Sequence, residues 1–133
     1  MTQTGIYETI TAVRTVRIDS DLSAKTNYLV TLDGTDDLVV NLAAAATAPV
    51  FVLIEGTNGS SSESVGTIAL AGCIVRVKAG GGITAGDKIT SHTNGTGIAT
   101  TTDKQYVAGI AMENASSGDE FLMMVAPSQV SNT

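Results

Sequence analysis

The sequence predicts an all-β fold, a single small β-barrel or β-sandwich domain with a flexible N-terminal arm. Turn signals recur at intervals of roughly ten residues, which is typical of short strands that follow one another along the chain. The apolar residues are mostly Val, Ile, Leu and Ala, and β-branched side chains favour strands. No helical periodicity extends beyond about two turns. A chain of 133 residues fits one domain, so we divide it into an arm, residues 1–8, and a β domain, residues 9–133.

The arm is polar, and chain ends without apolar patterning are commonly loose. Ile6 and Tyr7 are large apolar side chains within it, and Glu8 follows them. A tyrosine provides much contact area for little loss of conformational entropy. We therefore expect Ile6, Tyr7 and Glu8 to contact a partner.

The segment from Thr9 to Asp19 alternates between apolar and polar residues, which predicts a half-buried strand. The residues expected on its apolar face are Ile10, Ala12, Val16 and Ile18. Arg14 is the exception on that face.

The next part of the chain predicts three strands. Residues 27–42 form two of them, joined by a turn at Asp33-Gly34. Residues 43–49 are rich in alanine, but Pro49 would stop a helix, so we expect a short helical turn or an extended connector. VFVLIEG, residues 50–56, then predicts a fully buried strand, and residues 56–64 predict a polar loop.

The second half of the sequence predicts further strands, separated by polar or glycine-rich turns. They are VGTIAL, CIVRVK, ITAGDKIT with a tight turn at residues 85–87, GIAT, YVAGIAME and EFLMMVAP. Asn94-Gly95 is a strong hairpin signal. Met123 and Met124 point to opposite faces of the last strand, so we expect one in the core and the other at a contact surface.

The glycine-rich stretch AGGGITAGDKITSHTNGTG, residues 79–97, raises the question of a phosphate-binding loop. Such a loop needs a strand, then glycines, then a helix whose N-terminal amides face the anion. Here the glycines precede more strand signal, and no Gly-Lys-Ser or Gly-Lys-Thr follows. The glycines therefore predict turns, since glycine adopts positive φ without steric cost.

Composition excludes several classes of partner. Seven basic residues face thirteen acidic ones, for a net charge of −6, whereas binding to a nucleic-acid backbone needs dense positive charge. No apolar run approaches the roughly 18 residues that span a membrane. The lone cysteine rules out an internal disulfide. Charged residues are only 15% of the chain, below the usual quarter or so, which favours close contact with other protein at little desolvation cost.

Candidate catalytic and metal-binding residues are few. His92 is the only histidine, and we interpret it as an exposed loop residue, because adjacent Ser91 would point to the opposite face of a strand. Cys73 is expected to be a buried, inert thiol. Asp33, Asp36 and Asp37 cluster in a turn but lack the regular spacing of a calcium loop, so we interpret them as a solvated turn, with a weak calcium site as the alternative. We expect no enzyme activity, no metal, no cofactor and no small-molecule substrate.

The chain has two Asp-Lys pairs, Asp87-Lys88 and Asp103-Lys104. Each is similar to the Asp-Lys pair whose lysine carries a lipoyl group at a hairpin tip in small β-domains. Lys104 lies in a predicted turn, where a carrier lysine would have to be, whereas Lys88 begins a predicted strand. A carrier domain stays an alternative, although chance Asp-Lys pairs are common.

Residues 79–127 resemble the C-terminal half of tailed-phage head decoration proteins, also called capsid cement proteins. The shared pattern runs through Ala85 to Ser91, Asn94 to Ala99, Val107 to Ala115 and Gly118 to Val125. A looser likeness extends back through VGTIALAGCIVRVKAGG, while the first sixty residues match only in general character. The pattern consists of turns and small apolar residues and contains no catalytic group.

The resemblance implies a structural protein of the virion, made in the host cytoplasm. Such proteins bind the outside of an expanded icosahedral head, commonly as homotrimers, and lock neighbouring major capsid protein subunits together. It also implies that a terminal arm contacts the shell. The other alternative is a carbohydrate- or host-surface-binding β-module, which would need exposed aromatic residues. The candidates are Tyr7, Tyr28, Tyr106, Phe51 and Phe121, of which both phenylalanines look buried.

Overall fold

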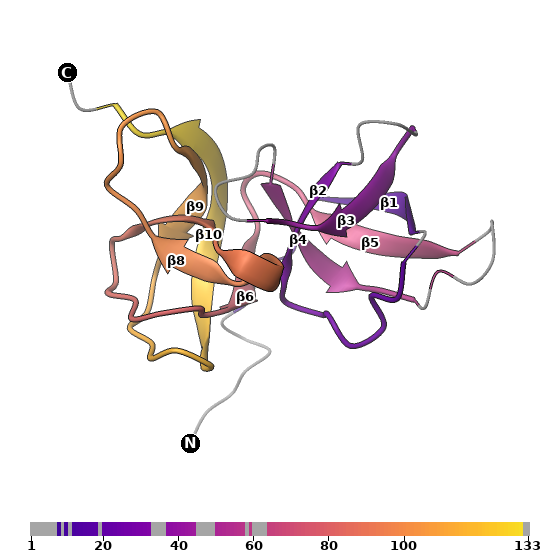
Figure 1. The fold of residues 1–133 in the computed structure, drawn as a ribbon, viewed down its shortest axis with the longest axis horizontal. Helices are drawn as coiled ribbons and strands as arrows, with labels where there is room; N and C mark the ends of the chain where they lie inside the picture. Colours follow the sequence, from indigo (N-terminus) through magenta and orange to yellow (C-terminus); the bar gives the residue numbers. More distant parts are fainter. Residues whose placement is uncertain are drawn as a thin grey trace.

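The computed structural model describes residues 8, 10, 12–18, 20–32, 37–44, 50–57, 59 and 64–131. Five strands form a closed barrel in the order β1-β3-β2-β4-β5, and a second five-stranded sheet lies beside it (Figure 1). The barrel strands are β1 Val13–Ile18, β2 Leu29–Leu32, β3 Val39–Leu42, β4 Val50–Glu55 and β5 Val65–Ala69. The sheet strands are β6 Ile74–Lys78, β7 Lys88–Ser91, β8 Gly97–Ala99, β9 Tyr106–Ala111 and β10 Glu120–Gln129. The predicted all-β fold is confirmed.

The barrel closes through β1, which pairs with strands on both sides. It runs antiparallel to β5 over five residue pairs, and parallel to β3 through Arg17 with Val39 and Ile18 with Val40. The interior is filled by Val16, Ile18, Leu22, Val30, Val40, Leu53 and Ile68. Gly66 faces Ile18 so closely that any side chain there would collide with it. The barrel is therefore narrow and filled by side chains.

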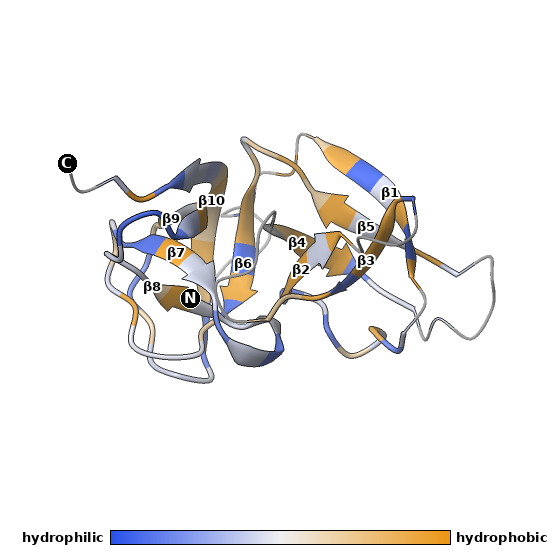
Figure 2. Cartoon of the chain, turned by 45° about the horizontal axis from the view of Figure 1, so that its top comes forward, coloured by the Kyte–Doolittle hydropathy of each residue, from blue (hydrophilic) through white to orange (hydrophobic). Residues whose placement is uncertain are grey.

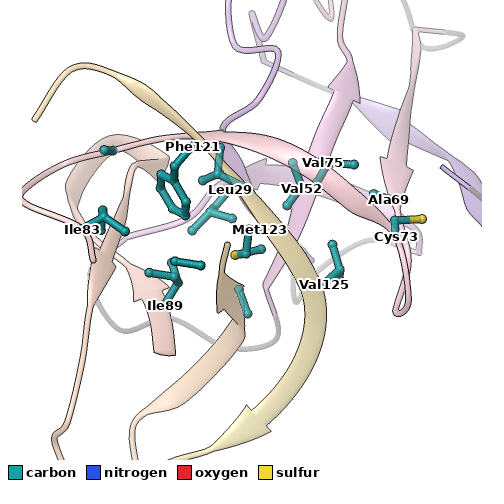
Figure 3. Packing of buried hydrophobic residues seen from close by; sticks show 14 of the residues in the cluster. Leu29, Val52, Ala69, Cys73, Val75, Ile83, Ile89, Phe121, Met123 and Val125 are labelled. Atoms are coloured by element: carbon teal, nitrogen blue, oxygen red, sulfur yellow. The ribbon is translucent and has the colours of Figure 1, made fainter. Parts of the chain in front are cut away.

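The middle of strand β4 is buried on both faces, as predicted, whereas Ile54 is only partly buried and Glu55 is exposed. Leu53 points into the barrel, whereas its neighbour Val52 points outward, and neither is exposed. Val52 pairs with Leu29 on one side and with Ala69 on the other. Figure 3 shows these three residues facing side chains of the second sheet, in one continuous cluster. The outer wall of the barrel is thus part of the sheet's core.

The second sheet has the order β6-β10-β9-β7-β8. Its inner face supplies Val75, Val77, Ile89, Phe121, Met123 and Val125 to the shared core. The sheet curls, because an isolated parallel bridge joins Ala79, after β6, to Gly97 at the start of β8. Met123 is fully buried and Met124 is 39% exposed, so one of the two methionines lies in the core as predicted; a contact role for the other stays a prediction.

The predicted apolar face of the first strand is wrong at its N-terminal end. Val16 and Ile18 are buried, but Ile10 is 46% exposed. The reason is that β1 begins only at Val13, so Ile10 precedes the strand and does not lie over the barrel interior. Arg14 lies opposite Ile68 and remains exposed. Phe121 is buried as expected, whereas Phe51 is only partly buried against the barrel core.

The turns explain the glycine-rich stretch. After Ala79 the chain bends and re-enters a strand, with no helix between residues 80 and 91, so the predicted turns are confirmed. Asn94 and Gly95 lie in the β7–β8 hairpin, in the short 3-10 turn η1 Thr93–Gly95, with φ of 56° and 76°. A side chain at position 95 would meet the Leu29 carbonyl oxygen at 2.7 Å. Glycine is required there on both counts.

Candidate binding surfaces

Of the predicted arm, residues 1–8, the structure describes only Glu8. Ile6 and Tyr7 lie outside the described residues, whereas Glu8 is described and partly buried. The carbonyl oxygen of Ala12 accepts hydrogen bonds from the Leu70 amide, at 3.0 Å, and from the Cys73 thiol, at 3.1 Å. The chain therefore enters the barrel beside the start of β6, and Cys73 is buried as predicted.

His92 differs from the prediction of an exposed loop residue. It is partly buried where the β7–β8 turn begins, and its Nδ1 atom is buried without a hydrogen-bond partner among the described residues. The Ser91 hydroxyl donates to the Ala44 carbonyl oxygen at 2.7 Å and so directs its proton toward the barrel. The pair does not have the geometry of a nucleophile and its base.

The structure describes some of the metal-binding and carrier candidates. Asp33 and Asp36 lie outside the described residues, and Asp37 is exposed. Among the described residues, no group of three His, Cys, Asp or Glu side chains could hold a metal ion. Lys104 is exposed in the turn before β9 with φ of 68°, and Lys88 opens β7, so the predicted positions of both lysines are confirmed.

Two hollows of the described surface are open to solvent. One of about 400 Å³ lies where the barrel meets the sheet, lined in part by Lys25, Tyr28 and Lys78. The Lys25 ammonium stands 4.7 Å from the centre of the Tyr28 ring. Another, of about 350 Å³, is lined by neutral polar residues including Thr90 and Gln105. Neither brings together the acid, base and nucleophile of a catalytic site. In the part of the chain that the structure describes, no helix is long and apolar enough to cross a membrane.

One surface is apolar where an exposed sheet face is usually polar. We call it the outer face; it comprises Ile74, Arg76, Ile110, Met112, Leu122 and Met124. Met124 pairs with Ile74 and with Ile110 on the flanking strands. Leu122 pairs with Arg76, and its carbonyl oxygen accepts the Met112 amide at 2.8 Å. Figure 2 shows β6 as mainly hydrophobic with hydrophilic bands. The sequence pointed only to one of Met123 and Met124, without saying which, although GIAM and FLMM place apolar residues on both faces of their strands.

The segments that resemble decoration proteins contain residues that stabilise turns of the second sheet. Gly86 has φ of 96°, and its amide donates to the Ala111 carbonyl oxygen at 2.8 Å. The Asp87 carboxylate accepts the Thr84 amide at 2.9 Å and fixes the same turn. The Glu113 carboxylate accepts the Leu122 amide at 3.1 Å. In this motif the two carboxylates therefore hold backbone amides in place.

Gly109, in the same motif, permits a close approach between strands. A side chain at this position would collide with the Met124 carbonyl oxygen and would meet the Met123 side chain at 3.0 Å. Met123 belongs to the shared core (Figure 3), and the glycine lets its strand, β10, pair closely with β9.

Comparison with known proteins gives a family and a fold. A family model described as phage cement protein matches residues 29–126. The structure is similar to the crystal structure of the N base of head fiber gp8.5 from bacteriophage phi29. The TM-score is 0.67 and the identity 24%, over 91% of this chain and 98% of that one. No curated protein matches the sequence. The resemblance to cement proteins is confirmed.

Proposed function

Because the chain belongs to the phage cement protein family, a family of structural phage proteins, we propose that it binds the outside of an icosahedral phage head. There it cements neighbouring major capsid protein subunits and stabilises the expanded shell. The observation that carries this proposal is the family match, which runs from the start of β2 into β10 and so includes strands of both the barrel and the sheet.

The chemistry of the surface supports a cementing role over catalysis. Contact with protein needs complementary shape and few desolvated charges, and a chain with 15% charged residues offers such a surface. Many modest contacts repeated by the symmetry of a shell add up to strong retention. In this proposal the protein works as a homotrimer, without a cofactor, substrate, nucleic acid or membrane, and Ile6, Tyr7 and Glu8 are contact residues.

Co-sedimentation with expanded heads that lack the protein tests the proposal. Wild type should pellet with the heads, and heads carrying it should release their DNA at a higher temperature than bare heads. Deletion of residues 1–8 should weaken binding but leave the circular dichroism spectrum of the β fold unchanged, because the described barrel begins after this segment.

A C-terminal truncation that removes residues 132–133 is the matched control and should bind as wild type does. If wild type fails to bind any head, the cementing function is wrong. If wild type and the deletion of residues 1–8 bind equally, residues 6–8 are not contact residues.

A further inference from the structure

The hollow where the barrel meets the sheet is positively charged, although the whole chain carries a net charge of −6. We call it the junction hollow; the lining residues that matter here are Lys25, Tyr28, Lys78, Gly80, Asn94 and Gly118. Its described lining includes two of the seven basic residues of the chain and no Asp or Glu side chain. A cleft lined by charge of one sign attracts ligands of the opposite sign. The junction hollow is therefore a candidate site for an anion.

Backbone hydrogen bonds hold the walls of the junction hollow in place. The Lys78 amide donates to the Asn27 carbonyl oxygen at 2.9 Å, which ties the end of β6 to the segment before β2. The Gly80 amide donates to the Gly97 carbonyl oxygen at 2.8 Å. The η1 turn, the coiled ribbon of Figure 1, lies between the sheet and the barrel. A site whose walls are fixed before binding loses little conformational entropy when it is occupied.

Neither lysine of the junction hollow forms an ion pair within the part of the chain that the structure describes. The Lys25 ammonium stands 4.7 Å from the centre of the Tyr28 ring, which orients the charge without neutralising it. Lys78 lies opposite Glu120 in the β6–β10 ladder. The Glu120 carboxylate, however, accepts a hydrogen bond from the Asn27 side-chain amide at 3.0 Å. Both ammonium groups, each on a partly buried side chain, can thus donate to an added anion.

The chemistry of the lining favours a carboxylate over a phosphate. Phosphate sites use free backbone amides at a helix N-terminus or in a glycine-rich turn. Here the Gly80 and Gly118 amides already donate to carbonyl oxygens of the chain. The described lining also contains no arginine, whose planar fork matches phosphate with two hydrogen bonds. Two lysines and the exposed side-chain amide of Asn94 suit the oxygens of one carboxylate.

We propose that the junction hollow binds the side chain of a Glu or Asp residue of the major capsid protein. Because the hollow is open to solvent, a small free carboxylate would stay largely hydrated there, and affinity requires that a larger partner also contacts the surface. A glycan site needs an exposed aromatic ring, whereas Lys25 lies over the Tyr28 ring of this lining. Charge complementarity directs a partner to one place and fixes its register. The inference rests on the proposed function in taking the capsid as the source of the carboxylate.

Nitrogen-15 NMR titration of the purified full-length protein tests the site without heads. A capped hexaglutamate peptide should cause saturable shifts of the Gly80, Asn94 and Gly118 amides, and a capped hexaglutamine peptide should cause none. Asn94→Asp adds a carboxylate to the junction hollow and should weaken binding of hexaglutamate several-fold. This variant should fold, because the position is exposed and Asp tolerates its φ of 56°.

Two double variants with the same change in net charge locate the site. Lys25→Gln, Lys78→Gln should raise the Kd for hexaglutamate on the order of tenfold. The matched control is Lys88→Gln, Lys104→Gln, which removes two exposed positive charges outside the described lining of the junction hollow. It should bind as wild type does.

Equal shifts with hexaglutamine, or equal Kd values for the two double variants, would overturn the inference. Tighter binding of inorganic phosphate than of hexaglutamate would also overturn it, because the site would then be a phosphate site. The same holds for oligogalacturonate, because the ligand would then be an acidic saccharide.

Co-sedimentation with expanded heads separates the inference from the proposed function. Lys25→Gln, Lys78→Gln should raise the concentration that half-saturates the heads on the order of tenfold, and Lys88→Gln, Lys104→Gln should leave it unchanged. If both double variants bind heads as wild type does, the junction hollow does not contact the capsid, and the inference is wrong while the proposed function stands. If wild type binds no head, the proposed function is wrong, and the capsid as the source of the carboxylate is wrong with it.

Discussion

The barrel and the second sheet have five strands each but reach stability in different ways. The barrel depends on closure, and its parallel β1–β3 seam has two residue pairs. The sheet depends on antiparallel ladders, of which β6–β10 has five pairs, and on turns fixed by side chains such as Asp87 and Glu113. The charge differs as well. Residues 1–70 contain three basic and eight acidic residues, whereas residues 71–133 contain four basic and five acidic residues. The sheet thus relies on antiparallel ladders and on turns fixed by side chains, whereas the barrel relies on closure through β1.

The largest expected effect tests whether the two regions form one domain, as we propose. Phe121→Ala in the sheet should cost about 3–5 kcal/mol, and Leu53→Ala in the barrel about 2–5 kcal/mol. Because Val52, beside Leu53, packs in the shared core, each change should lower the protection of amides in both regions. Native-state hydrogen exchange measures this. Loss confined to the mutated region would mean two separate domains.

A smaller effect concerns the close approach of β9 and β10. Gly109→Val should destabilise the protein by about 1–3 kcal/mol, because the new side chain collides with the backbone of Met124. Gly82→Ala is the matched control, since nothing lies within 4 Å of a Cβ there. Chemical denaturation followed by circular dichroism gives both values. Equal midpoints for the two variants would show that β10 can move away without cost.

The smallest effect concerns a turn of the barrel. The Ser23 hydroxyl donates to the Asp21 carboxylate at 2.7 Å, and the Ser23 amide does so at 3.1 Å. Both bonds lower the pKa of Asp21 from its ordinary value of 3.8. A lowered pKa in the folded state means that this contribution to stability is present above the unfolded pKa and is lost as the pH falls through the folded one.

Carbon-13 NMR titration of the Asp21 carboxyl measures this shift. Ser23→Ala should raise the pKa of Asp21, because the hydroxyl bond is its largest cause. It should reduce thermal stability slightly at neutral pH and by less in acid. An unchanged Asp21 titration in Ser23→Ala would contradict the assignment.

Local patterns predicted most of the strands, and non-local pairing escaped prediction. VFVLIEG was identified as buried on both faces because it is almost wholly apolar, and β4 is buried at Val52 and Leu53. The parallel contact of β1 with β3 joins residues more than twenty positions apart, and no alternation of apolar residues encodes it. Nor does the sequence show that the barrel wall at Leu29 and Ala69 also faces a second sheet.

Among the candidate site residues, too, some features were predictable from neighbouring residues and others depended on the fold. Burial of Cys73 and the turn position of Lys104 followed from neighbouring residues. The outer face escaped prediction, because it requires the register that sets Met124 beside Ile74 and Ile110. The half-burial of His92 depends on the fold around its hairpin, which a single segment does not reveal.

The row formed by Leu29, Val52 and Ala69 has a consequence for how such proteins diversify. These side chains belong to the barrel by sequence and to the sheet by packing, against partners such as Val75 and Met123. A recombination event with its crossover at residues 70–73 would join a barrel wall to a core that it does not fit. Barrel and sheet should therefore be inherited as a unit, while exposed loops vary freely. Shuffling the two halves between related genes should yield folded hybrids only where the residues on both sides of this row are exchanged together.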